Sequence, residues 1–187
     1  MAWDRDSLSP TWTSVDVEKA SKMPVIAFGA DSWGMPLAPT ISAVFLDRGL
    51  EWVDFSGGPS RTYPDIAADV AGAIQSGRCE RGILVCGTGL GMAIVANKFH
   101  RVRAATVHDP YSAVRARASN DAQIITMGAL VVDAAVVAAI VTCWLDAEFD
   151  PHRSGAKLAR VRSIDDAERR PAPARADHEA RHGQRRT

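Results

Sequence analysis

Apolar and polar positions alternate along the chain in blocks that predict strands and helices in turn. Short, almost wholly apolar runs indicate buried strands, and longer stretches with apolar residues three or four apart indicate amphipathic helices. This pattern predicts strands at 24–30, 51–56, 81–86, 102–108 and 122–128. It predicts helices at 38–50, 63–77, 91–99, 111–120 and 133–149. Gly49 and Gly77 stand where two of these helices should end.

This alternation predicts a parallel sheet covered by helices on both faces. Five strand–helix units in roughly 130 residues correspond to one doubly wound α/β domain, with the third strand near the middle of its sheet. Residues 1–22 are expected to form an N-terminal arm and residues 23–168 the domain. The sequence after Phe149 is charged with some helical periodicity, and residues 169–187 form an Arg-, Pro- and Ala-rich tail that we expect to be disordered.

Composition narrows the class of protein. The chain has 187 residues, 47% of them hydrophobic. The charges of its 22 basic and 22 acidic residues cancel, so its formal net charge is zero. We therefore expect no binding to nucleic acid or membranes, and the basic tail is expected to be solvated. The polar N-terminus is unlike a secretory signal, which favours a cytoplasmic protein. Cys79, Cys86 and Cys143 lack the spacing of a disulfide framework or a zinc site.

The segment CGTGLGMA at 86–93 is the strongest chemical signal in the chain. It places Cys86 where the third strand should end, and glycines that allow a tight turn into a helix follow at once. Backbone N–H groups and the helix N-terminus favour an anion there, and they favour the thiolate form of a cysteine. The spacing fits neither a dinucleotide-binding fingerprint nor a P-loop. The pattern favours an anion-binding turn beside a cysteine thiolate that acts as a base. The alternative is a structural turn with an inert cysteine.

Three segments together resemble the ribose-5-phosphate isomerase B/galactose-6-phosphate isomerase (RpiB/LacAB) family of sugar-phosphate isomerases. They are GILVCGTGLGMAIVANK, VHDPYSAVRARASNDAQIITMGA and IAFGADSWG, and the likeness runs from about residue 25 to residue 164. The resemblance implies a Rossmann-like three-layer α/β/α sandwich with a five-stranded parallel sheet. It also implies a homodimer, or a dimer of such dimers, with active sites at the subunit interface and without metal or cofactor. The implied reaction interconverts an aldose phosphate and a ketose phosphate through a cis-enediolate. Ribose 5-phosphate and ribulose 5-phosphate are the leading pair.

The resemblance also implies roles for individual residues. Cys86 would be the general base, and Thr88 would join it as a catalytic residue in the turn. The implied substrate-binding residues are Asp31, Ser32, Gly87, Gly89, Leu90, Gly91, Asn120, Arg153 and Arg160. Asn120 and the arginines would act on the neighbouring subunit's site, and Lys157 is a further candidate for the phosphate. Tyr63 stands where the family has an aromatic residue near the pocket, although a packing role is equally expected.

Two positions depart from the family pattern. Ser32 and Ser119 stand where family members usually have histidines, which are credited with phosphate binding and ring opening. A serine hydroxyl cannot shuttle protons at neutral pH as an imidazole can. A tetrose 4-phosphate has O4 blocked and needs no ring opening, so it is the alternative substrate, although His108 could serve a pentose. A non-catalytic sugar-phosphate-binding subunit of a hetero-oligomer is a further alternative.

Overall fold

The computed structural model describes residues 24–58 and 60–169. In this part of the chain the strands are β1 (Ile26–Ala30), β2 (Trp52–Asp54), β3 (Arg81–Cys86), β4 (Ala104–Thr106) and β5 (Ile124–Gly128). The α-helices are α2 (Ala38–Asp47), α3 (Tyr63–Gln75), α4 (Leu90–Ala96), α5 (Pro110–Asn120), α6 (Ala134–Asp146) and α7 (Pro151–Glu168). A short 3-10 helix, η1 (Met35–Leu37), precedes α2. Every predicted strand and helix is present, with ends shifted by a few residues.

The strands form one parallel sheet in the order β2-β1-β3-β5-β4. β3 lies at its centre, as predicted, and pairs with β1 on one side and β5 on the other. In this register Cys86 stands opposite Gly128, at the carboxyl end of both strands. The carboxyl ends of the central strands are therefore where the glycine turn begins.

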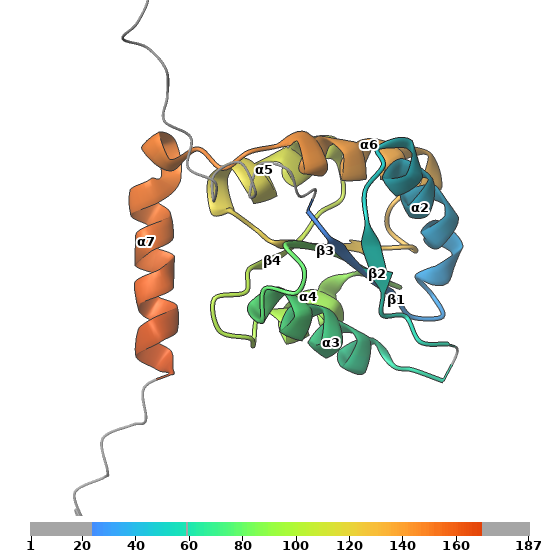
Figure 1. The fold of residues 1–187 in the computed structure, drawn as a ribbon, viewed down its shortest axis with the longest axis horizontal. Helices are drawn as coiled ribbons and strands as arrows, with labels where there is room; N and C mark the ends of the chain where they lie inside the picture. Colours follow the sequence, from blue (N-terminus) through green and yellow to red (C-terminus); the bar gives the residue numbers. More distant parts are fainter. Residues whose placement is uncertain (1–23, 59, 170–187) are drawn as a thin grey trace, which may run out of the picture.

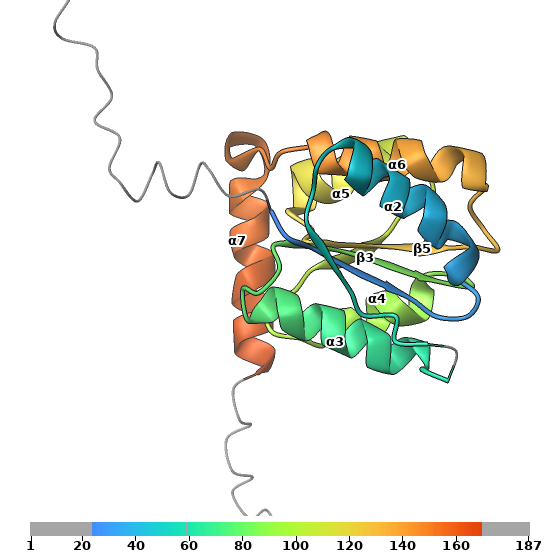
Figure 2. The same cartoon turned by 45° about the vertical axis from the view of Figure 1, so that its right-hand side comes forward.

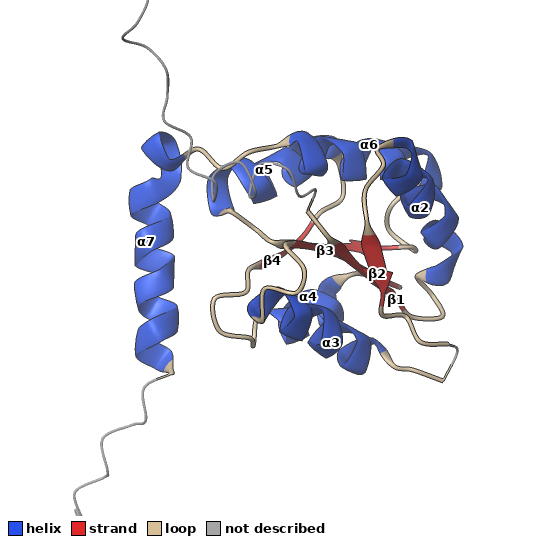
Figure 3. Ribbon diagram, in the orientation of Figure 1, coloured by secondary structure: helices blue, strands red, loops and turns tan. Residues whose placement is uncertain are grey.

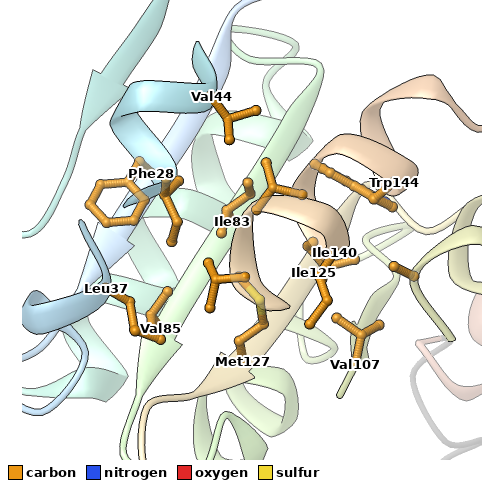
Figure 4. Close-up of a cluster of buried hydrophobic side chains, with 14 of the residues drawn as sticks. Phe28, Leu37, Val44, Ile83, Val85, Val107, Ile125, Met127, Ile140 and Trp144 are labelled. Carbon is orange, nitrogen blue, oxygen red and sulfur yellow. The ribbon is translucent and has the colours of Figure 1, made fainter. Parts of the chain in front are cut away.

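Helices cover both faces of the sheet, which confirms the predicted three-layer α/β/α sandwich (Figures 1 and 3). α2, α5 and α6 lie on one face, and α3 and α4 lie on the other (Figure 2). Each face has its own apolar core. Figure 4 shows the core under α2 and α6, where Ile83 and Val85 of β3 lie among Phe28 and the fully buried Trp144.

Several helices begin at an aspartate that caps the first turn. The Asp109 side chain accepts a hydrogen bond from the Ser112 amide, and Pro110 follows it in the first helical position of α5. Asp133 caps α6, and Asp150 caps α7 by accepting from the amides of His152 and Arg153. A side-chain oxygen at this position satisfies N–H groups that have no partner within the helix. These caps fix where the loops at the sheet ends become helices.

The long helix α7 stands beside the sandwich rather than over a face of the sheet (Figures 1 and 2). Ser154 and Leu158 are its buried residues. Its other contacts are largely charged, and they reach the loops that lead into β4 and β5. α7 therefore lies at the amino ends of these strands, away from Cys86.

The predicted arm at 1–22 lies outside the described residues, as does the predicted tail at 169–187 apart from Arg169. No helix in the described ranges is both long enough and apolar enough to cross a membrane.

Candidate active site

Cys86 ends β3, and the turn that follows holds its sulfur in place. The side chain is only 6% exposed, and the Gly89 amide donates a hydrogen bond to Cys86 Sγ at 3.1 Å. Gly89 adopts a left-handed conformation, with φ of 78°, immediately before α4. The sulfur therefore lies at the N-terminal end of α4, where the Gly89 amide points toward it.

Neighbouring elements pack so tightly on this turn that glycine is required at several positions. A Cβ on Gly89 would lie 2.9 Å from the Met127 carbonyl carbon, and one on Gly128 would lie 2.5 Å from Thr88 Cα. A Cβ on Gly91 would lie 2.6 Å from the Tyr63 ring. Real Cβ atoms essentially never approach this closely. β5 and α3 thus hold the amides of the turn in fixed positions, as a site for a developing oxyanion requires.

Asp31 follows β1 and faces the same end of the sheet. Its amide donates to the Val85 carbonyl at 3.2 Å, next to Cys86. Its Oδ1 accepts hydrogen bonds from the amides of Trp33 and Gly34, at 3.0 and 2.9 Å. The carboxylate is therefore oriented by the backbone and keeps its second oxygen for another donor.

A cavity of about 410 Å³ opens beside Asp31. Its polar lining residues are Asp31, Ser32, Asp54 and Ser56, and no lysine or arginine is among the described residues that line it. Two carboxylates repel a phosphate but accept hydrogen bonds from hydroxyl groups. This cavity suits the hydroxyls of a sugar. Asp54 and Ser56 were not singled out in the sequence, although their place after β2 follows the same strand-end rule as Asp31.

The other predicted site residues gather at the opposite end of the sheet. A cavity of about 450 Å³ lies between α7, the end of α5 and the start of β4. Its polar lining comprises Arg103, Ser119, Asn120, Arg153, Ser154 and Lys157. Arg103 is paired with Asp121 at 2.7 Å, which leaves Arg153 and Lys157 as the cations that, with an amide and hydroxyls, suit a phosphate.

Arg160 does not line this cavity. Its guanidinium donates to Ser163 Oγ at 3.2 Å on the exposed side of α7. Of the three candidates for the phosphate, Arg153 and Lys157 lie in the cavity beside Asn120.

Arg115 is a residue whose role the sequence did not indicate. Its guanidinium donates to Ser119 Oγ, and its carbonyl accepts from the Asn120 side-chain amide at 3.3 Å. Neither the guanidinium of Arg115 nor the hydroxyl of Ser119 is a group that exchanges protons at neutral pH. Arg115 thus contacts Asn120, which the resemblance assigns to the neighbouring subunit's site, and Ser119, which stands where the family usually has a histidine.

A single chain keeps these two groups of residues apart. Cys86 and Asp31 lie at the carboxyl ends of the strands, and Asn120 and Arg153 lie at the amino ends. The length of β5 separates them, and its five residues alone span roughly 13 Å. One sugar phosphate contacting both groups therefore needs the second group from another copy of the chain.

The other two cysteines, Cys79 and Cys143, do not lie in a glycine turn like that of Cys86. Cys79 is buried in the core beneath α3, and burial raises the pKa of its thiol. Cys143 lies on α6, and all three cysteines are free thiols. Across residues 24–58 and 60–169, no group of three or more His, Cys, Asp or Glu side chains could hold a metal ion.

Known proteins resemble the chain over the whole of this domain. A family profile described as Ribose/Galactose Isomerase matches residues 26–164. A ribose-5-P isomerase B of Listeria innocua is 44% identical over 146 residues, covering 77% of this chain and 99% of that protein. A D-erythrulose-4-phosphate isomerase of Pectobacterium atrosepticum is 47% identical over 139 residues, covering 73% of this chain and 91% of that protein.

Solved structures show the same likeness as the related sequences. A ribose-5-phosphate isomerase B of Clostridium thermocellum superposes with a TM-score of 0.74 and 38% identity, covering 77% of this chain and 99% of that one. The α/β/α fold thus has a counterpart in a solved ribose-5-phosphate isomerase B. The chain belongs to the Ribose/Galactose Isomerase family.

Proposed function

We propose that the chain is an aldose–ketose isomerase of a sugar phosphate, with Cys86 as its general base. The thiolate takes the proton from the carbon next to the substrate carbonyl, and the electron pair of that C–H bond forms the enediolate. The thiol then returns a proton to the neighbouring carbon while a proton moves between the two oxygens, so no oxidant is needed. The hydrogen bond from Gly89 to Cys86 Sγ is the observation that carries the proposal, because it places a held sulfur beside fixed amides.

We infer that each active site is completed by a second copy of the chain. Among the described residues, the lining of the cavity beside Asp31 has carboxylates and hydroxyls but no lysine or arginine, whereas the cavity under α7 has Arg153 and Lys157 besides the paired Arg103. In this arrangement the sugar hydroxyls face Asp31 and Asp54, and the partner's α7 binds the phosphate. Ser32 then contacts a hydroxyl, and Arg153 and Lys157 are the phosphate residues in preference to Arg160.

Ribose 5-phosphate and ribulose 5-phosphate are the first candidate pair, as for the relative from Listeria innocua. Ser119 favours a second candidate, erythrose 4-phosphate and erythrulose 4-phosphate. Its hydroxyl is held by Arg115, and neither group can protonate a ring oxygen at neutral pH. The relative from Pectobacterium atrosepticum carries the name of this second substrate.

Solvent deuterium exchange tests the reaction itself. Each aldose and ketose phosphate is incubated with the protein in D₂O, and deuterium on carbon is followed by NMR. We expect incorporation by the wild type and by Cys79→Ser, and a loss of at least about 1,000-fold in Cys86→Ser because the base is gone. Equal incorporation by Cys86→Ser would contradict the proposal.

A comparison of open and closed substrates decides between the two sugars. Ribulose 5-phosphate cannot close a five-membered ring because O5 carries the phosphate, whereas ribose 5-phosphate closes through O4. Without a ring-opening acid, the protein should convert ribulose 5-phosphate and erythrulose 4-phosphate well and ribose 5-phosphate slowly, and Ser119→His should raise the rate on ribose 5-phosphate. A strong preference of the wild type for ribose 5-phosphate would remove the tetrose candidate.

A further inference from the structure

Two large apolar side chains flank the catalytic turn and face solvent. Trp33 is 62% exposed and Leu130 is 68% exposed. A Cβ on Gly87 would lie 3.5 Å from Leu130 Cδ1 and 3.9 Å from Trp33 Cβ and Cγ. Both side chains thus lie beside Gly87, the residue directly after Cys86, and we call Trp33 and Leu130 the apolar bracket.

The backbone fixes both members of the apolar bracket to the end of β3. The Trp33 amide donates to Asp31 Oδ1, and Asp31 in turn donates to the Val85 carbonyl. On the other side, the Leu130 amide donates to the Gly87 carbonyl at 3.0 Å, and the Ala129 amide donates to the Cys86 carbonyl at 2.8 Å. The two side chains are therefore held at the turn by the same hydrogen bonds that shape it.

The apolar bracket and the cavity beside Asp31 offer different chemistry. The cavity presents carboxylates and hydroxyls to the polar groups of a ligand. The apolar bracket presents only carbon, apart from the indole N–H. Small-molecule sites commonly combine an apolar wall with a few placed polar groups. Exposed indole and isobutyl groups lose unfavourable contact with water when the carbon atoms of a ligand cover them.

We propose that Trp33 and Leu130 contact the carbon skeleton of the substrate at the reacting carbons, and that they set the affinity of the site for it. This rests on the proposed function. The sugar hydroxyls face Asp31 and its neighbours, and the C–H face of the same carbons packs on the indole and on Leu130 beside Gly87. The contact is equal before and during enolisation, so it lowers KM rather than raising kcat.

Steady-state kinetics of Trp33→Ala, Trp33→Phe and Leu130→Ala test this, with whichever sugar phosphate the wild type isomerises. We expect Trp33→Ala to raise KM about tenfold with kcat within about twofold, and Trp33→Phe to restore most of the affinity, because an aromatic face remains. Leu130→Ala should raise KM about threefold, since it removes less apolar area. An unchanged KM in Trp33→Ala would overturn the proposal.

Tryptophan fluorescence gives a readout that does not depend on turnover. Ribitol 5-phosphate and erythritol 4-phosphate lack a carbonyl and cannot be enolised, so they report binding alone. Saturating either one should change the emission of the wild type, and this change should disappear in Trp33→Phe. The matched control is Trp52→Phe, which removes a tryptophan that packs on Phe45 at the amino end of β2. If the change persists in Trp33→Phe and disappears in Trp52→Phe, the proposal is wrong.

A second copy of the chain could cover the apolar bracket instead of the sugar. In that case Trp33→Ala would weaken self-association, measured by sedimentation, and KM would return to the wild-type value at high protein concentration. That result would overturn the proposal and leave the isomerase intact. Absence of deuterium exchange into every sugar phosphate would instead refute the proposed function, so the two failures are distinguishable.

Discussion

The two ends of the sheet are built in different ways. At the carboxyl end, backbone hydrogen bonds and closely packed glycines hold the turn after Cys86. At the amino end, α7 is held largely by charged side chains, with His100 Nε2 at 2.6 Å from Asp166 Oδ1 and Arg101 Nη2 at 3.2 Å from Asp166 Oδ2. The first end is held rigidly by the backbone, and the second presents cations on a helix at the side of the domain. The comparison teaches that a single chain places the two groups of candidate site residues at opposite ends of its sheet.

The largest effect should come from a substitution at the carboxyl end of the sheet, which we call the rigid end. Gly89→Ala places a methyl group against the Met127 backbone and forces a positive φ on alanine. We expect kcat to fall at least about 100-fold, as when one oxyanion donor is lost, with a lower Tm.

Gly77→Ala is the matched control for this change. Gly77 also has a positive φ, of 75°, but no atom lies near its missing Cβ. This variant should lose stability through the backbone and keep its kcat. A Gly89→Ala protein with wild-type kcat would contradict the account of the rigid turn.

Substitutions at the amino end of the sheet, which we call the cationic end, should weaken the binding of the substrate. Arg153→Ala and Lys157→Ala should each raise KM by roughly 10- to 100-fold, because a hydrogen bond to a charged group contributes about 1.5–3 kcal/mol. Arg160→Ala, on the exposed side of the same helix, should leave KM unchanged. A larger effect in Arg160→Ala than in Arg153→Ala, measured in steady-state assays, would reverse this assignment.

The smallest effect concerns how α7 is attached. The hydrogen bond with His100, followed by that with Arg101, lowers the pKa of Asp166. A carboxyl group with a lowered folded-state pKa stabilises the fold above its unfolded pKa of about 3.9, and this contribution is lost as the pH falls through the folded-state pKa. Acid, or Asp166→Asn at neutral pH, should therefore loosen α7.

Hydrogen exchange of the α7 amides measures this loosening. We expect exchange in the C-terminal half of α7 to rise a few-fold in Asp166→Asn. Asp146→Asn, which breaks the Arg48–Asp146 pair on another helix, should leave α7 unchanged. Equal exchange in α7 of wild type and Asp166→Asn would show that the pair does not hold the helix.

The sequence predicted the rigid end better than the cationic end, for a physical reason. Buried strands and glycine turns depend on local pattern, so β3 was predicted with the bounds 81–86 that the structure has, and Cys86 with its place at the strand end. α7 is an 18-residue charged helix with few buried residues, so its periodicity was weak. Which of its cations share a cavity depends on helix phase and on packing against β4 and α5, so Arg153 and Lys157 could not be chosen over Arg160 from spacing alone.

Trp33 illustrates the same limit. Its position beside Gly87 depends on the path of the loop after β1 across the end of β3, which no local pattern specifies. The resemblance supplied the candidate site residues, and the fold divides them between the two ends of the sheet.

Activity of a mixed dimer tests that division most directly. A chain carrying Cys86→Ser is co-expressed with a chain carrying Arg153→Ala and Lys157→Ala, and the heterodimer is isolated with two affinity tags. If sites are shared, one site carries every substitution and the other carries none, so the heterodimer should have roughly half the wild-type activity while both parent homodimers stay severely impaired. A heterodimer no more active than the mean of its two parents would contradict the account.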